Sequence, residues 1–174
     1  METIWTVGHS TRTLDEFITL LSIHDIHVLA DVRAYPGSRR YPHFNRQVLS
    51  PALERAGISY LWFQNLGGWR RPRPDSRNTA LKSAGFRGYA DYMETQDFKE
   101  AITSLLNTAR EKRTALMCAE ALWWRCHRSL ISDYMKSTGV QVLHILDERT
   151  IQEHPYTSAG RISDGRLTYE PIDR

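Results

Sequence analysis

The sequence predicts a single α/β domain built on a mostly parallel sheet of about five strands, with helices on both faces and a small hairpin near the C-terminus. Strand-like apolar runs alternate with helix-like amphipathic runs along the chain, a pattern typical of parallel sheets joined by crossover helices. The length of 174 residues suits one domain. No repeat or low-complexity tract divides the chain, so residues 1–174 are expected to form one unit.

Local signals place the elements in order. Thr13 and Glu16 form a capping box that starts a helix. A later helix has alternative starts at Asn45 and at Ser50, which precedes Pro51. Near the end, a turn formed by residues 164–165 favours the hairpin. The expected elements are strands at 4–7, 28–32, 58–63, 114–118 and 140–145, and helices from 13, from 45 or 50, over 97–110 and from 127 to 139.

Two long loops carry most of the positive charge, at residues 33–46 and 64–87. Between residues 33 and 87 there are eleven Lys or Arg and two acidic residues, whereas the other 119 residues carry twelve basic and eighteen acidic groups. Such segregation favours an anionic partner, because clustered charge attracts phosphates and releases their counterions. A solvated basic face is the alternative.

Aromatic side chains are interleaved with this positive charge. Arginines next to aromatics suit a sugar-phosphate backbone and exposed bases, through charge pairing and stacking. The loops are therefore expected to bind a nucleic acid or a nucleotide. The residues concerned include Tyr35, Arg39, Arg40, Tyr41, His43, Phe44, Trp69, Arg70, Arg71, Arg73, Arg77 and Lys82.

Polar residues follow every predicted strand of the sheet. Ligands of parallel sheets bind outside the carboxyl ends of the strands, and those ends share one edge. A functional pocket is therefore predicted there, although loops carry polar residues in general. The residues are His9 and Ser10, Asp31 and Arg33, Gln64 and Asn65, Cys118 and Glu120, and Asp147.

Glu120 is the leading candidate for acid–base or nucleophilic chemistry, because a carboxylate just past a buried strand takes such a role or pairs with an arginine. Arg125 and Arg33 are the candidate pairing partners. His9 is expected to carry a proton, with Asp31 orienting its ring, or else to be structural.

The segment from Cys118 to Arg128 predicts an anion pocket, because a helix start supplies free N–H groups and a positive dipole end. The same positive field would make a nearby thiol more nucleophilic, although buried cysteines are often inert packing. A metal site from His9, Cys118, Cys126 and His127 is disfavoured by its spacing. The catalytic candidates are Glu120, Cys118 and His9, and the substrate-binding candidates are Ser10, Arg12, Asp31, Arg33, Arg39, Arg40, Asn45, Arg125, Cys126, His127 and Arg128.

Composition excludes several classes of protein. No apolar run approaches the roughly 20 residues that cross a bilayer, and the first residues lack the features of a secretory signal. There are two cysteines, which we expect to be free thiols in a cytoplasmic protein. The sequence assigns neither a cofactor nor an oligomeric state.

Several motifs together resemble the bacterial domain-of-unknown-function family 488. They are Gly8-His9-Ser10-Thr11-Arg12, Asp31-Val32-Arg33 with Pro36, Ser38-Arg39-Arg40, Phe44-Asn45, Leu66-Gly67-Gly68, Cys118-Ala119-Glu120 and Trp124-Arg125-Cys126-His127-Arg128. The resemblance implies a small cytoplasmic α/β fold and no particular activity. A weaker likeness to rhodaneses and cysteine phosphatases rests on the Asp-Val-Arg strand end and the strand–Cys-loop–helix unit. In those families an arginine closes the loop five residues after the cysteine, whereas here Arg125 comes later.

Taken together, these features predict an enzyme that acts on a nucleic acid or nucleotide. Hydrolysis or group transfer is favoured because no G-x-G-x-x-G dinucleotide fingerprint occurs. Two alternatives stay open: a non-catalytic nucleic-acid-binding module and a thiol enzyme of the rhodanese or phosphatase type.

Overall fold

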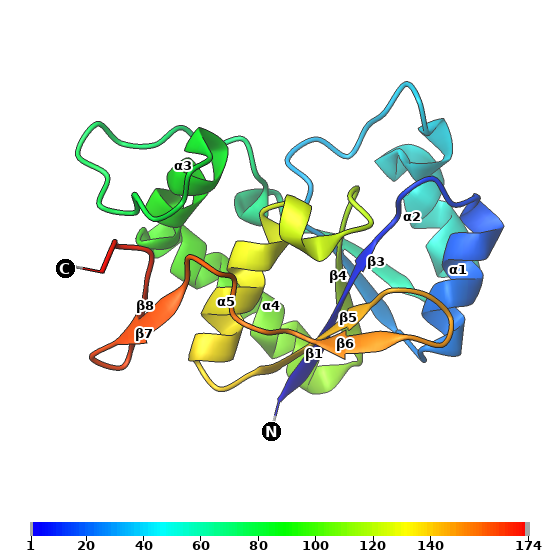
Figure 1. Cartoon of the computed structure of the whole chain (residues 1–174). Helices are drawn as coiled ribbons and strands as arrows, with labels where there is room; N and C mark the ends of the chain where they lie inside the picture. The colour runs from blue at the N-terminus through cyan, green and yellow to red at the C-terminus, as the bar shows by residue number, and fades with distance from the viewer. Residues whose placement is uncertain (1, 173–174) are drawn as a thin grey trace.

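The core of the protein is a sheet with the strand order β3-β2-β4-β1-β5-β6, shown in Figure 1. Strands β1 to β5 run parallel, and β6 pairs antiparallel with β5. This computed structural model describes residues 2–172. The strands are β1 Thr3–Gly8, β2 Val28–Asp31, β3 Ser59–Trp62, β4 Thr114–Cys118, β5 Gln141–Ile145, β6 Ile151–Glu153, β7 Arg161–Ser163 and β8 Arg166–Thr168, and the α-helices are α1 Leu14–Ile23, α2 Arg46–Arg55, α3 Ala84–Met93, α4 Gln96–Glu111 and α5 Arg128–Ser137.

The fold class predicted from the sequence is confirmed. Two apolar clusters cover the two faces of the sheet. Phe17 of α1 and Leu49 of α2 belong to the first cluster, while Phe98 of α4 and Ile131 of α5 belong to the second. Short 3₁₀ turns at 42–44, 64–66 and 123–125 lie in the connections. Among the described helices, none is long and apolar enough to span a membrane.

The connections that leave β1 and β4 run in opposite directions along the sheet. The chain passes from β1 over to β2 through α1, on one face, and from β4 over to β5 through α5, on the other. Because β1 and β4 are neighbours, their carboxyl ends mark the place where the winding of the sheet reverses. In open α/β sheets, such reversal points are where ligands usually bind.

Local signals in the sequence act as expected at both ends of the chain. The Thr13 side chain accepts from the Glu16 N–H at 3.1 Å, and the Glu16 carboxylate accepts from the Thr13 N–H at 3.1 Å, which completes the capping box of α1. Asp164 and Gly165 adopt φ of 51° and 74° between β7 and β8. Both left-handed conformations are those of a two-residue type I′ hairpin turn.

The structure adds two elements that the sequence does not predict. Strand β6 extends the sheet to a sixth strand, and helix α3 begins at Ala84, inside the loop that the sequence predicted to run to residue 87. Gly88 lies in α3, and a Cβ there would stand 2.1 Å from the Arg70 carbonyl oxygen. The Asp91 carboxylate of α3 accepts from the Arg73 N–H, the Ser76 hydroxyl and the Asn78 amide at 2.7 to 2.8 Å. The loop is therefore held against α3 along much of its length.

A buried hydrogen-bonded chain ties the C-terminal segment to α5 and the sheet. Asp133 Oδ1 bonds His154 Nε2 at 2.7 Å, His154 Nδ1 bonds His144 Nε2 at 2.8 Å, and His144 Nδ1 bonds Thr6 Oγ1 at 2.5 Å. The second oxygen of Asp133 accepts from the hydroxyls of Thr157 and Tyr169. All four members of the chain are at most 1% exposed. A buried polar chain of this kind is stable only when every member is satisfied.

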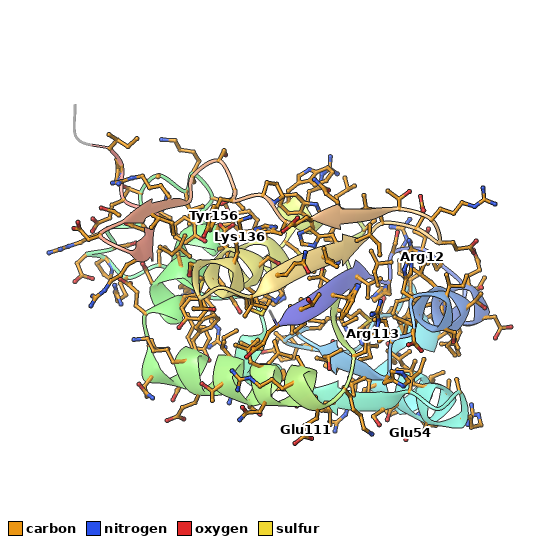
Figure 2. The ribbon with its side chains drawn as sticks, turned by 90° about the horizontal axis from the view of Figure 1, so that it is seen from below. Arg12, Glu54, Glu111, Arg113, Lys136 and Tyr156 are labelled. Carbon is orange, nitrogen blue, oxygen red and sulfur yellow. The ribbon has the colours of Figure 1, made fainter. Side chains whose placement is uncertain are left out.

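Two cation–aromatic contacts involve Lys136 and Arg113, which Figure 2 labels. Lys136 of α5 lies against Tyr156, with its nitrogen 5.2 Å from the ring centre, so the segment after β6 is also fixed to α5. Arg113, just before β4, stacks on Trp5 at 3.7 Å. Because Arg113 precedes its strand, this second contact lies at the amino ends of the strands, away from the predicted site.

We expect Asp133→Asn to lower the free energy of unfolding by about 3 kcal/mol, because the substitution removes the charge of a buried carboxylate that His154, Thr157 and Tyr169 share. Urea denaturation followed by circular dichroism measures the change. The matched control is Asp164→Asn in the exposed hairpin turn, where asparagine tolerates the left-handed conformation and the change should stay below about 0.5 kcal/mol. Equal denaturation midpoints for the two variants would contradict the role given to Asp133.

Candidate functional site at the carboxyl ends of β1 and β4

The carboxyl ends of β1 and β4 remain paired beyond the strands themselves. The His9 N–H donates to the Cys118 carbonyl at 3.0 Å, and the Ser10 N–H donates to the Ala119 carbonyl at 2.9 Å. A Cβ on Gly8 would stand only 1.7 Å from the Glu120 carbonyl oxygen. The loop after β4 therefore folds closely over the end of β1, and only glycine fits beneath it. His9 and Glu120, far apart in sequence, lie at the same edge of the sheet.

Glu120 places its backbone and its side chain in different environments. Its carbonyl oxygen accepts from Arg128 at 3.0 Å and from the Cys118 thiol at 3.6 Å. Its side chain is exposed and, within the described chain, forms no ion pair with Arg125 or Arg33. The carboxylate is thus held at the reversal point of the sheet with its oxygens in solvent.

Asp31 and Arg33 form a closed pair next to this edge. Arg33 Nε and Nη2 donate to the two Asp31 oxygens at 2.9 and 2.8 Å, and Nη2 also donates to the Phe44 carbonyl at 2.9 Å. The Tyr60 hydroxyl donates to Asp31 at 2.5 Å. The carboxylate is fully buried. Asp31 therefore orients Arg33 and, among the hydrogen bonds of the described residues, makes none to His9.

His9 lies in an aromatic setting. Its ring stacks on Phe44 with centroids 4.2 Å apart, and the edge of Tyr41 stands 6.4 Å away. His9 Nδ1 bonds the Ser10 carbonyl oxygen at 2.8 Å. Burial lowers the pKa of His9 to about 4, and the nearby charge of Arg33 acts in the same direction. The imidazole is therefore neutral at pH 7 and able to accept a proton, but it does not carry a positive charge.

The two thiols lie together beneath the loop after β4. Cys118 Sγ and Cys126 Sγ are 3.0 Å apart, with one thiol donating to the other. This hydrogen bond and the charge of Arg128 outweigh burial and lower the pKa of Cys118 to about 7. The hydrogen bond to Cys118 and burial raise the pKa of Cys126. Cys118 is therefore the member of the pair that ionises first.

Arg128 is a buried arginine without a carboxylate partner in residues 2–172. Its side chain is 1% exposed, and its Nη2 donates to the carbonyl oxygens of Glu120 and Ala121 at 3.0 and 3.2 Å. Its Nε has no hydrogen-bond partner there. A buried charge needs a compensating charge nearby, because desolvation otherwise makes it costly. The ionised Cys118 thiol, which bonds the same Glu120 carbonyl when protonated, is suited to supply that charge.

His127 links the thiol loop to the basic loops. Its Nε2 bonds the Val32 carbonyl oxygen at 2.9 Å, and its ring lies 5.0 Å from that of Tyr89. A Cβ on Gly68 would come within 3.1 Å of His127 Nδ1. Burial lowers the pKa of His127 to about 4. The start of α5 and the loop after β3 are therefore in direct contact.

The two predicted basic loops also touch each other. A Cβ on Gly67 would meet the Ala34 Cα at 2.6 Å, so the segments after β2 and β3 lie side by side above the carboxyl ends of their strands. Each loop presents a large aromatic side chain to solvent: Tyr35 is 75% exposed and Trp69 is 90% exposed. Trp69 also has a φ of 64°, a left-handed conformation uncommon for a bulky residue.

The same two loops also carry exposed cations. Arg39, Arg71, Arg77 and Lys82 are exposed, and in the described part of the chain their side chains form no ion pair or hydrogen bond. Arg40 and Arg70 instead lie over Tyr41 and Tyr92, at 5.6 and 3.6 Å from the ring centres. We use the name basic aromatic surface for the exposed side chains of the two loops, which are Tyr35, Trp69, Arg39, Arg71, Arg77 and Lys82.

The other candidates from the sequence serve different contacts. Arg12 donates to the carbonyls of Gly8 and Leu146 at 2.6 and 3.1 Å, and borders a hollow of about 370 Å³ beside Asp147 at the end of β5. The Asn45 side chain accepts from the Ser38 N–H at 2.5 Å. Ser10 has a φ of 54° at the edge of the sheet. The side chain of Arg125 is exposed. The arginine whose charge acts on the Cys118 thiol is Arg128.

Sequence reasoning missed two further features of the structure. A hollow of about 640 Å³ lies between α3, α5 and the β7–β8 hairpin, bordered by Asn78 and Tyr134. The buried pair of His144 and Trp123, stacked at 4.6 Å, was missed as well. One signal in the sequence could have indicated that His144 is buried. Side chains alternate along β5, so His144 lies on the same face of the sheet as the buried Val142. Among the described residues, no group of His, Cys, Asp and Glu is arranged to hold a metal ion.

We expect acid to destabilise the protein as the pH falls from about 6.5 toward 4. Burial lowers the pKa of His9 and of His127 to about 4 and that of His144 to about 2, whereas histidines in an unfolded chain titrate near 6.5. Below about pH 6.5 the unfolded chain then binds more protons than the folded chain. The free energy of unfolding therefore decreases as the pH decreases through this window, and it is fully retained above the window. Urea unfolding between pH 7 and 5 measures the slope, which His9→Gln should reduce. An unchanged slope in that variant would contradict a neutral buried His9.

Comparisons with known proteins place the chain in a family without naming an activity. Residues 13–135 match the family described as Domain of unknown function DUF488. Neither the search of curated proteins nor the search of solved structures found a match. The matched segment includes the basic loops, the thiol loop and most of α5. Because it covers more than half of the chain, this protein belongs to the DUF488 family.

Proposed function

We propose that this protein binds single-stranded nucleic acid through the basic aromatic surface. The observation that carries the proposal is the exposure of Trp69 and Tyr35, at 90% and 75%, on two neighbouring loops that also bear unpaired cations. Exposed bases stack on aromatic rings, and cations beside the rings bind the phosphates between the bases.

The exposure of Trp69 does not reflect a loosely attached loop. The loop packs on α3 at Gly88, and Asp91 accepts three hydrogen bonds from it. The backbone of Trp69 adopts a left-handed conformation, and its indole is exposed. Such strain persists when surrounding contacts impose it, and it is concentrated at functional sites. An indole kept out of the core in this way is suited to stack against a ligand.

The arginines at the strand ends are already paired or buried, which favours the loops as the binding region. Arg33 is neutralised by Asp31, and Arg128 is buried behind the Glu120 and Ala121 carbonyls. The loops, in contrast, keep Arg39 and Arg71 free in solvent. Phosphates are therefore expected to meet the loops first.

A second candidate function is catalysis on the bound nucleic acid or nucleotide, by hydrolysis or group transfer. The observation that favours it is the exposed carboxylate of Glu120, fixed through its own carbonyl at the reversal point of the sheet. Neutral His9 and the Cys118 thiol lie at the same edge. In this arrangement Glu120 acts as acid, base or nucleophile on a substrate held by the loops.

Replacing an exposed aromatic should weaken binding. We expect Trp69→Ala to raise the dissociation constant for a fluorescent single-stranded oligonucleotide about 5- to 100-fold, since stacking contributes roughly 1–3 kcal/mol per base. Fluorescence anisotropy measures the constant. Arg39→Gln should reduce the salt dependence of the dissociation constant by about one phosphate contact. Arg149 is an exposed arginine after β5, and Arg149→Gln should leave this salt dependence unchanged. Equal affinity of Trp69→Ala and the wild-type protein would contradict the proposal.

Replacing the exposed carboxylate tests the catalytic candidate. We expect Glu120→Gln to reduce any turnover of oligonucleotides or nucleoside phosphates at least ~100-fold, while the dissociation constant stays at the wild-type value. Glu148→Gln, in the exposed loop after β5, is the matched control and should keep full turnover. Product analysis by liquid chromatography measures both variants. Complete absence of turnover in the wild-type protein would leave binding as the function, and full activity of Glu120→Gln would contradict the catalytic role of Glu120.

A further inference from the structure

The two thiols of the chain lie closer together than their spacing of eight residues requires. Cys118 ends β4, and Cys126 lies just before α5, after a loop that folds back over the strand end. Their sulfur atoms are 3.0 Å apart. A disulfide bond measures about 2.05 Å, so an approach of about 1 Å would join them. The sequence contains no further cysteine with which either could pair.

The surroundings of the pair favour a reactive thiolate at Cys118. The buried guanidinium of Arg128 lacks a carboxylate partner among residues 2–172, and its charge acts on the Cys118 sulfur. The other sulfur is held separately, because the backbone N–H of Arg128 donates to Cys126 Sγ at 3.4 Å. A thiolate is the nucleophilic form of cysteine, and a neighbouring positive charge stabilises it. The hydrogen bond between the sulfurs keeps Cys126 next to the Cys118 sulfur.

We propose that Cys118 and Cys126 form a redox-active dithiol that a small hydroperoxide oxidises to an intramolecular disulfide. The Cys118 thiolate attacks the terminal peroxide oxygen; the O–O bond breaks, the alcohol or water leaves with a proton, and Cys118 becomes a sulfenic acid. The Cys126 thiol then attacks the Cys118 sulfur, the S–O bond breaks, and water leaves as the disulfide forms. The two sulfurs together lose two electrons, which the peroxide gains.

Access to the pair explains the choice of oxidant. Cys118 is 3% exposed, and Cys126 is partly buried. Hydrogen peroxide is close to water in size and can reach such a sulfur, whereas a bulky disulfide cannot approach it in line. This inference does not depend on nucleic-acid binding, because it rests on Cys118, Cys126 and Arg128 alone.

Mass spectrometry of the full chain tests the proposal. After hydrogen peroxide treatment at pH 7, we expect the monomer to lose the mass of two hydrogen atoms. Trypsin cuts after Arg125, between the cysteines, so the peptides 114–125 and 126–128 should appear joined and should separate on reduction. A wild-type monomer that stays fully reduced under excess peroxide, or that reaches sulfinic and sulfonic acids without the joined peptides, would overturn the proposal.

Two serine variants separate the roles of the sulfurs. In Cys126→Ser, the sulfenic acid at Cys118 should persist and be trapped by dimedone, which should not label the wild-type protein. In Cys118→Ser, oxidation of Cys126 at pH 7 should be at least ~10-fold slower than that of Cys118 in Cys126→Ser, because the proposal assigns the attack on peroxide to Cys118. Equal rates in the two variants, or dimedone labelling of the wild type at the level of Cys126→Ser, would contradict the proposed order of steps.

Discussion

The buried guanidinium of Arg128 is the interaction on which the carboxyl edge of the sheet depends. It lies in the first turn of α5 and holds the Glu120 and Ala121 carbonyls, so it fixes the loop that covers the end of β1. A charge in that position would be costly if it were isolated. The same charge acts with the hydrogen bond from Cys126 to lower the pKa of Cys118, so Arg128 contributes both to the shape of the loop and to the ionisation of the thiol beneath it.

The distribution of positive charge follows a similar logic. Arginines close to the sheet have internal partners: Arg33 has Asp31, and Arg12 has backbone carbonyls. On the long loops, Arg39 and Arg71 face water, Arg70 lies over Tyr92, and Arg73 pairs with Glu94 at 2.7 Å. Counting charge along the chain finds the basic segment, but only the structure separates the cations that stabilise the fold from those that a ligand can reach.

Local signals allowed much of the fold to be predicted. The capping box at Thr13 and the turn at Asp164 depend on neighbouring residues, and both appear as expected. Helix α3 was missed because Gly88 reads as a helix breaker, although glycine is required there by the close approach of Arg70. The three-residue strand β6 has too little pattern of its own, and it forms because β5 offers an edge.

The candidate site could be predicted in place but not in detail. Strand ends brought His9, Cys118 and Glu120 to one edge because parallel strands share their direction. The partner of Asp31 could not be predicted in the same way: the sequence led us to expect that Asp31 orients His9, whereas packing pairs it with Arg33. The Asp133 to His154 contact joins residues 21 apart and has no local signature at all.

The position of β1 in the sheet bears on where the structural unit of this family begins. The family match starts at residue 13 and ends at residue 135, so it leaves out β1 and β5. Yet β1 lies between β4 and β5 in the sheet, and its pairing with β4 closes that strand's second edge. A fragment limited to the matched span would present β4 as an unpaired apolar edge, which is prone to associate with other chains. A stable recombinant unit therefore has to extend beyond the matched span at both ends.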